Sequence, residues 1–115
     1  MTAVDLDTIR SDINVLRGEL VAHGGMLFER EVSDLRGAVH ALAMPGSAVR
    51  EFPIGRVPRG VRQIRASLVE VRERYEQVLL SGTWRHGARD GLVDLNRAIA
   101  ALTITLARAT EKAAA

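Results

Sequence analysis

The sequence contains no cysteine, three prolines and four aromatic residues among its 115 positions. The absence of cysteine excludes disulfide bonds and thiolate metal sites. Because aromatic rings are scarce, a hydrophobic core must be built from leucine, valine, isoleucine and alanine, the composition of packed helices. Apolar residues make up 47% of the chain and charged residues 26%, which is typical of one folded domain.

Long hydrophobic runs and a recognisable export leader are also missing. No segment approaches the roughly 18 consecutive apolar residues of a membrane span. The start of the chain is acidic, with Asp5 and Asp7, and lacks the basic and apolar blocks of a signal peptide. We therefore expect a soluble protein that is either cytoplasmic or exported without a cleavable signal peptide.

What the sequence does have is a regular spacing of apolar residues in four segments. The intervals alternate between three and four positions, which places these residues in a stripe along one face of an α-helix. A seven-residue period is typical of coiled coils and antiparallel bundles. The stripes comprise Leu6, Ile9, Ile13, Leu16 and Leu20; Phe28, Val32, Leu35, Val39 and Leu42; Val61, Ile64, Leu68, Val71, Tyr75 and Val78; and Leu92, Leu95, Ile99, Leu102 and Leu106. The pattern predicts an all-α domain, either a three- to four-helix bundle or a coiled-coil-like assembly.

The N-terminal helical region, residues 1–44, has two alternative interpretations. Gly24 and Gly25 separate its two stripes, and two glycines cost about 2 kcal/mol in a helix relative to alanine, which favours a turn. However, Leu20, Gly24 and Phe28 are spaced as in a stripe that continues through an inserted half-turn. We favour one long helix from Val4 to Met44, bent at the glycines, over a turn.

The rest of the chain divides into a connector and a helical hairpin. Residues 45–59 contain all three prolines and show no periodicity, so we expect an extended, basic connector, with the third helix beginning near Pro58. The hairpin covers residues 60–112. Its first helix should end near Leu80, and its second should run from about Ala88 to Ala109 and leave residues 110–115 as a frayed tail. Thr83 is a candidate N-cap of the second helix.

Charge is distributed unevenly along the sequence. Residues 1–45 carry four basic and seven acidic side chains, whereas residues 46–115 carry twelve and seven. Five arginines fall within sixteen positions: Arg50, Arg56, Arg59, Arg62 and Arg65. Such a cluster can contact nucleic-acid phosphates, or it can pair with the acidic N-terminal helix of its own or a neighbouring subunit. The scarcity of aromatic stacking residues argues against single-stranded nucleic acid.

No constellation of residues identifies a reaction or a bound metal. Glu19 and His23 would share a helix face, but metal-binding bundles use several such pairs, so a surface ion pair is the better interpretation. Ser81, His86 and Asp90 suit turn and capping roles better than a catalytic triad. The glycines match no phosphate-binding loop. We therefore expect a non-enzymatic protein with no cofactor and no metal.

One family resemblance concerns residues 60–112. An apolar-striped helix, the turn from Gly82 to Ala88 and an alanine- and leucine-rich helix together resemble the helical-hairpin substrates and partners of type VII secretion systems, which are named for a Trp-x-Gly turn. Here two residues separate Trp84 from Gly87, and no Tyr-x-x-x-Asp/Glu export signal follows the last helix. The resemblance implies that Trp84 and Gly87 shape the hairpin tip and present it to a partner. Alternatively, Trp84 closes the end of the bundle.

These observations favour a helical interaction or assembly protein that binds copies of itself or another helical protein, because some apolar stripes should exceed what one chain can bury. It would be a type VII-like secreted partner or, alternatively, a structural subunit of a larger particle such as a phage head or tail, with the connector as an arm. A further alternative is a nucleic-acid-binding accessory protein that uses the arginine-rich connector. The expected partner-binding residues are Trp84, Gly87, Arg50, Arg56, Arg59, Arg62 and Arg65.

Overall fold

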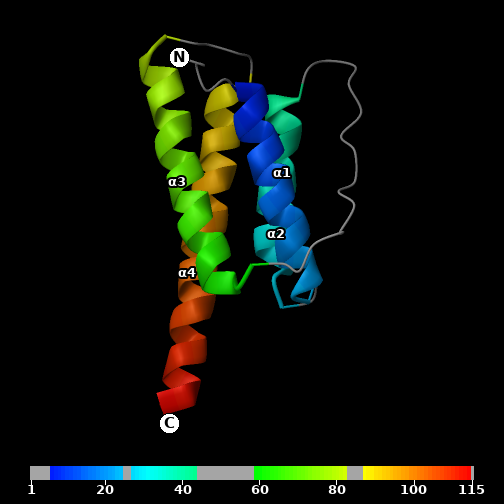
Figure 1. Cartoon of the computed structure of the whole chain (residues 1–115), viewed down its shortest axis with the longest axis vertical. Coiled ribbons are helices and arrows are strands. Elements are labelled where there is room, and N and C mark those ends of the chain that lie inside the picture. Colours follow the sequence, from blue (N-terminus) through cyan, green and yellow to red (C-terminus); the bar gives the residue numbers. More distant parts are fainter. Residues whose placement is uncertain (1–5, 25–26, 44–58, 83–86, 115) are drawn as a thin grey trace.

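The structure, a computed structural model, describes residues 6–24, 27–43, 59–82 and 87–114, with residues 110–114 as helix backbone. These residues form four helices and no strand (Figure 1). The helices are α1 (Leu6–Ala22), α2 (Glu29–Leu42), α3 (Val61–Leu80) and α4 (Ala88–Ala114). The predicted all-α helical bundle is confirmed.

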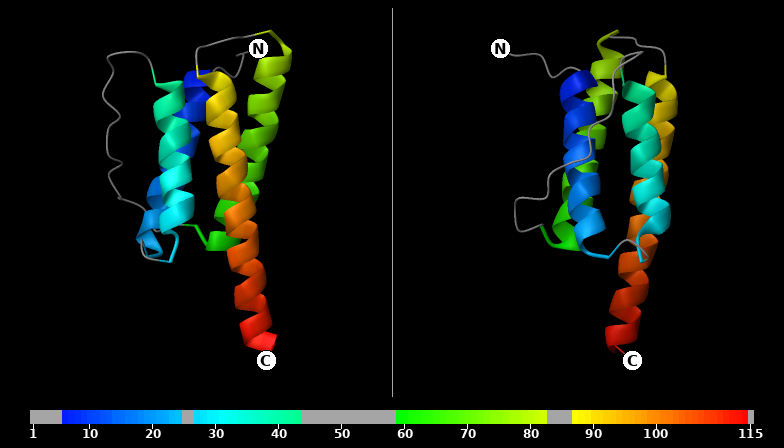
Figure 2. Two further views of the ribbon diagram at one scale, coloured as in Figure 1. Left: turned by 180° about the vertical axis from the view of Figure 1, so that it is seen from behind. Right: turned by 90° about the vertical axis from the view of Figure 1, so that its right-hand side faces the viewer.

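Each helix runs antiparallel to its two neighbours in the bundle. α1 and α4 each contact α2 and α3, whereas α2 and α3 lie diagonally across the bundle and run in the same direction (Figures 1 and 2). The end of α2 and the start of α3 therefore lie at opposite ends of the molecule. Joining them requires a crossover along the bundle, which explains the length of the link between Ala43 and Arg59. The predicted extended conformation of that link lies outside the described residues.

The four apolar stripes meet in one core inside a single chain. In the described part of the chain, twenty hydrophobic residues are buried, and they include every stripe member except Val32, Val61, Leu92 and Leu106, which are partly buried against them. The expectation that some stripes exceed what one chain can bury is therefore wrong: the α1–α2 and α3–α4 hairpins cover each other. Within the described part of the chain, no helix is both long and apolar enough to cross a bilayer.

A turn, not one long helix, separates α1 from α2, so the preferred interpretation of the N-terminal region is wrong. The backbone N–H groups of His23 and Gly24 donate to the carbonyls of Leu20 and Val21 at 3.1 Å, and Gly24 has a φ of +123°. Glycine adopts this conformation without the cost that a Cβ would add. Folding back brings Leu20 and Phe28 into the same core from opposite sides of the turn.

The C-terminal hairpin begins as expected and extends further than expected. Gly60 precedes α3, and its N–H donates to Gln63 Oε1 at 3.2 Å, so the side chain caps the helix start. α3 ends where Gly82, with a φ of +89°, reverses the chain. α4 continues to Ala114, so the predicted end of this helix at Ala109 is wrong. The proposed N-cap Thr83 lies outside the described residues.

α2 and α4 approach each other closely through small residues. A Cβ on Gly91 would lie 3.5 Å from the Ala38 carbonyl oxygen and 2.6 Å from the Tyr75 hydroxyl oxygen. The buried Tyr75 hydroxyl donates to the carbonyl of Ala88 at the start of α4. Tyr75 thus links α3 to the first turn of α4 by a hydrogen bond. This contact lies where Gly91 lets α4 pack closely against α2.

Candidate interaction surfaces

α4 projects beyond the end of the bundle where α1 ends and α2 and α3 begin. Thr105 Oγ1 donates to Glu31 Oε1 of α2 at 3.0 Å, and Arg65 Nε of α3 donates to Thr103 Oγ1 at 2.8 Å. These contacts place Thr103 and Thr105 level with the first two turns of α2 and α3. Residues 108–114 therefore extend past both neighbours, by about 10 Å at 1.5 Å per residue (Figures 1 and 2).

Large hydrophobic side chains are exposed at this same end. Leu27, just before α2, is 75% exposed; Ile104 of α4 is 53% exposed; and Val21, at the end of α1, is 38% exposed. Leu106 is only partly buried. We call this region the projecting end: α4 from Ile104 onward, Val21, Leu27 and the arginines at the start of α3.

The predicted arginine cluster is divided between two sides of α3. Arg59 faces α1, with its Nε 3.6 Å from Glu19 Oε2, an ion pair without a hydrogen bond, and its Nη1 donates to Ser67 Oγ at 3.3 Å. Arg65 faces α4 through Thr103. Pairing of a cluster arginine with the acidic N-terminal region, one of the two alternatives, is therefore seen for Arg59. Arg50 and Arg56 lie outside the described residues.

An open groove separates the start of α3 from α4. It has a volume of about 260 Å³ and is lined by Arg62, Arg65, Thr103, Leu106 and Ala107. The Thr103 hydroxyl donates to the Ile99 carbonyl at 2.7 Å and accepts from Arg65, so this guanidinium is held in place by a neutral group. The groove combines fixed positive charge with an apolar wall, which suits contact with another macromolecule.

Glu19 and His23 both contact Arg59. His23 Nε2 lies 2.5 Å from the Arg59 backbone carbonyl, which can only accept, so this nitrogen is the donor. The expected ion pair therefore involves Glu19 with Arg59, not Glu19 with His23. Among the described residues, no group of three or more histidine or carboxylate side chains is placed to hold a metal ion.

Gly87, a predicted partner-binding residue, is required for internal packing. It has a φ of +86°, and a Cβ on it would lie 2.5 Å from the carbonyl oxygen of Ala41 in α2. Trp84 and His86 lie outside the described residues. Ser81 Oγ donates to the Val78 carbonyl at 2.7 Å, as expected for a residue that ends a helix.

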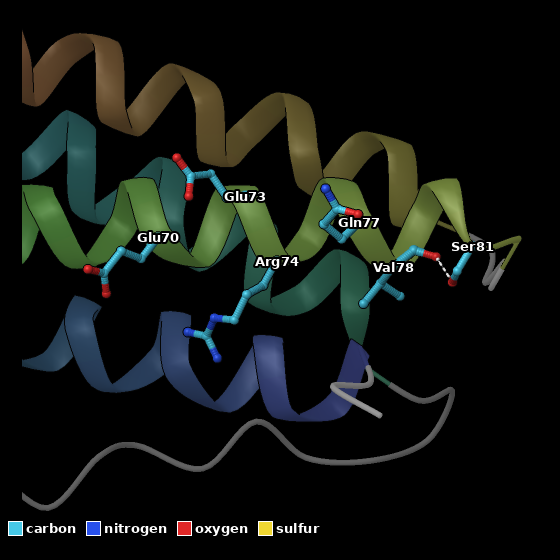
Figure 3. Close-up of a pocket in the computed structure, with 6 residues that line it drawn as sticks. All are labelled: Glu70, Glu73, Arg74, Gln77, Val78 and Ser81. Carbon is cyan, nitrogen blue, oxygen red and sulfur yellow. Dashed lines mark hydrogen bonds between the residues drawn. The ribbon is translucent and has the colours of Figure 1, made fainter. Parts of the chain in front are cut away.

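Another open groove runs along α3, with a volume of about 540 Å³. It is lined by Glu70, Glu73, Arg74, Gln77 and Val78 of α3 and by Ser81, which follows the end of that helix. The side chains diverge: Glu73 points toward the α4 side and Arg74 toward α1 (Figure 3). Arg74 Nη1 is 2.9 Å from Asp12 Oδ2. The ionisable side chains that line this groove, as far as the chain is described, thus come from α3, and Arg74 among them is paired with α1.

Carboxylates gather at the contact between α2 and α4. Burial, and next the nearby charge of Asp94, raise the pKa of Asp34. Glu31 is buried and accepts a hydrogen bond from the Thr105 hydroxyl. Asp94 Oδ1 lies 3.9 Å from Arg97 Nη1. A Cβ on Gly37 would lie 2.8 Å from Asp94 Oδ2, so this glycine makes room for the carboxylate. The sequence contains all these residues, but nothing in their spacing shows that they meet.

No family model, curated protein or solved structure matches the chain. The function must therefore be inferred from the chemistry of the surface. The features that the structure brings together are the arginines at the start of α3, the exposed Leu27 and Ile104, and the projecting part of α4. Sequence analysis identified the arginines but missed the exposed apolar residues, because Ile104 and Leu27 lie outside the four stripes.

Proposed function

We propose that the protein is a non-enzymatic helical interaction or assembly protein, and that it binds a partner protein through the projecting end. The observation that carries this proposal is the presence of exposed apolar side chains, arginines and an extended helix at the same end of the bundle. Interfaces of this kind combine an apolar centre with a charged margin. α4 supplies the helical segment that a partner would pack against.

The energetics of the projecting end support binding there. Burying an exposed leucine or isoleucine side chain contributes about 1.5–3 kcal/mol, so Leu27 and Ile104 together are a substantial source of affinity. Residues 108–114 form less than two further turns of helix beyond the neighbouring helices. A segment this short has little helical stability of its own, and packing against a partner would stabilise it.

The type VII-like interpretation and the particle-subunit interpretation both belong to this proposal. In the hairpin of residues 60–112, the apolar face of α3 and α4 is covered by α1 and α2. A partner hairpin can reach that face only by displacing α1 and α2. A secreted partner complex or a particle would therefore use the outer surfaces, and three of the five exposed large hydrophobic residues in the described part of the chain, Val21, Leu27 and Ile104, lie at the projecting end.

The test compares variants of the full chain in the cells that naturally make it. Replacing Leu27 and Ile104 with serine, or ending the chain at Ala107, should abolish co-purification and chemical cross-linking of the bound protein. Val93→Ser is the matched control, because Val93 is 48% exposed on the same helix but lies near the opposite end of the bundle. Circular dichroism should show unchanged helix content, apart from the segment removed.

Two results would contradict the proposal. One is a full chain that is monomeric and carries no bound protein at any concentration. The other is a complex that survives both sets of changes. Binding that falls steeply with salt, and that is lost in Arg62→Glu/Arg65→Glu but kept in the Leu27 and Ile104 variants, would favour nucleic acid instead.

A further inference from the structure

We propose that the outer face of α3 is a two-fold interface at which a second copy of the chain binds with its α3 antiparallel. This inference goes beyond the proposed function, since it names a second copy of the chain as a partner and a separate surface that binds it. The surface lies on the side of α3 next to α4, as the Arg65–Thr103 hydrogen bond shows. It is distinct from the exposed apolar residues of the projecting end.

Charge on this face is separated into two halves. Arg62 and Arg65 lie in the first turns of α3, and Glu73 and Glu76 lie in its second half. Together with Val69 between them, these residues are spaced by three, four, four and three positions. That spacing keeps all five on one strip of the helix surface. Arg62, Glu73 and Glu76 are exposed, and Arg65 and Val69 are half-buried.

The strip is self-complementary about its centre. Arg62 and Glu76 are each seven positions from Val69, and Arg65 and Glu73 are each four positions from it. In a two-fold dimer, every contact occurs twice with the roles of the two copies exchanged. An axis through Val69 with antiparallel helices therefore places the arginines of each copy beside the glutamates of the other. A parallel arrangement would place like charges together.

The neighbouring arginines do not neutralise these glutamates. Arg72 donates through Nη1 to Asn96 Oδ1 of α4 at 3.5 Å, and Arg74 reaches Asp12 of α1. Among the described residues, neither Glu73 nor Glu76 lies within ion-pair distance of a basic side chain. Both carboxylates are thus available to arginines of a second copy.

The apolar residues of the strip suit a close helix–helix contact. Ala66 and Val69 are small, and they occupy the centre where two helices would cross. Leu80 is 81% exposed beyond the acidic half, where it would reach the start of the partner copy's α3. Exposed ion pairs contribute little affinity individually, so the apolar contacts hold the copies together and the charges set their direction.

Charge reversal tests the arrangement directly in the full-length protein. Arg62→Glu/Arg65→Glu and Glu73→Arg/Glu76→Arg should each weaken the homodimer by roughly tenfold or more, measured by sedimentation equilibrium, because like charges then meet. An equimolar mixture of the two variants should form a heterodimer, since one strip is wholly acidic and the other wholly basic. Arg36→Glu, at an exposed arginine of α2, should leave the dimer unchanged.

A cysteine placed on the axis gives a second measurement that does not depend on charge. Because the chain lacks cysteine, Val69→Cys introduces its only thiol, and oxidised glutathione should join two copies at this position. Ser33→Cys, at an exposed site on α2, should not form the cross-link.

Three outcomes would overturn the two-fold interface: a strictly monomeric wild-type chain, a dimer unaffected by either reversal, or two reversed variants that fail to associate when mixed. Each leaves the proposed function standing if a partner protein still binds through Leu27 and Ile104. Conversely, the chain could form the two-fold dimer while the projecting-end variants still bind their partner protein. That result would contradict the proposed function and support this interface.

Discussion

At the scale of single residues, Tyr75 places a polar hydroxyl group inside the hydrophobic core. Its side chain is fully buried, and its hydroxyl donates to the Ala88 carbonyl. Burial raises the pKa of this phenol well above its ordinary value of 10, against the smaller opposing effect of a backbone hydrogen bond from Leu92. The sequence placed Tyr75 in a stripe, but its hydrogen bond depends on where α4 begins.

The raised pKa of Tyr75 predicts a loss of stability in alkali. The unfolded chain releases the phenolic proton near pH 10, whereas the folded chain retains it, so the stabilisation is complete below pH 10 and is lost as the pH rises further. The free energy of unfolding should fall with a slope approaching about 1.4 kcal/mol per pH unit. Denaturant titrations at a series of alkaline pH values measure this slope. In the Tyr75→Phe variant, the free energy of unfolding should no longer fall with this slope.

Ultraviolet absorbance offers a direct control, because Tyr75 is the only tyrosine. The phenolate band should appear only together with loss of helix. A phenolate band at pH 10 in the folded protein would contradict the burial of this hydroxyl.

At the scale of elements, the apolar spacing predicted an all-α bundle correctly, because burial on one face of a helix requires that spacing, but it left open whether three or four helices form. The stripe through Leu20, Gly24 and Phe28 misled the interpretation of α1 and α2, since a spacing cannot show whether the chain reverses at Gly24. The close contact of α2 with α4 could not be predicted from hydropathy. It depends on Gly87, Gly91 and Ala38, whose small size lets the two helices approach but adds little apolar surface. Arg59 contacts α1 and Arg65 contacts α4, and these contacts likewise depend on which helices flank α3.

The turn between α3 and α4 provides a matched pair of glycines for testing this packing. Gly82 and Gly87 both have positive φ, but a Cβ on Gly82 meets nothing within 4 Å, whereas one on Gly87 lies 2.5 Å from the Ala41 carbonyl oxygen. Gly82→Ala should cost about 1–2 kcal/mol of unfolding free energy, from backbone strain alone. Gly87→Ala should cost about 1–3 kcal/mol more, because α2 must move away.

Thermal and denaturant unfolding of the two glycine variants would measure this difference. Equal costs would show that α4 does not start against α2 as described. A Gly87→Ala variant with unchanged stability that loses a partner would instead assign this glycine to partner binding, as the family resemblance implies.

At the scale of the whole molecule, the chain is a four-helix bundle closed on itself. Its hairpins bury each other, so the proposed association would use the outside of the bundle, at the projecting end and the outer face of α3. The sequence suggested association through the stripes, whereas both proposals use residues outside them. Those residues could not be selected from sequence, because exposure is decided by the arrangement of all four helices.

Hydrogen–deuterium exchange of the backbone amides in residues 108–114 tests the central claim most directly. It would be measured on the isolated chain and on the complex purified from the cells that naturally make the protein. The account predicts rapid exchange in the isolated chain, where the segment lies beyond its neighbours, and strong protection in the complex. Equal exchange in both samples would contradict binding through the projecting end.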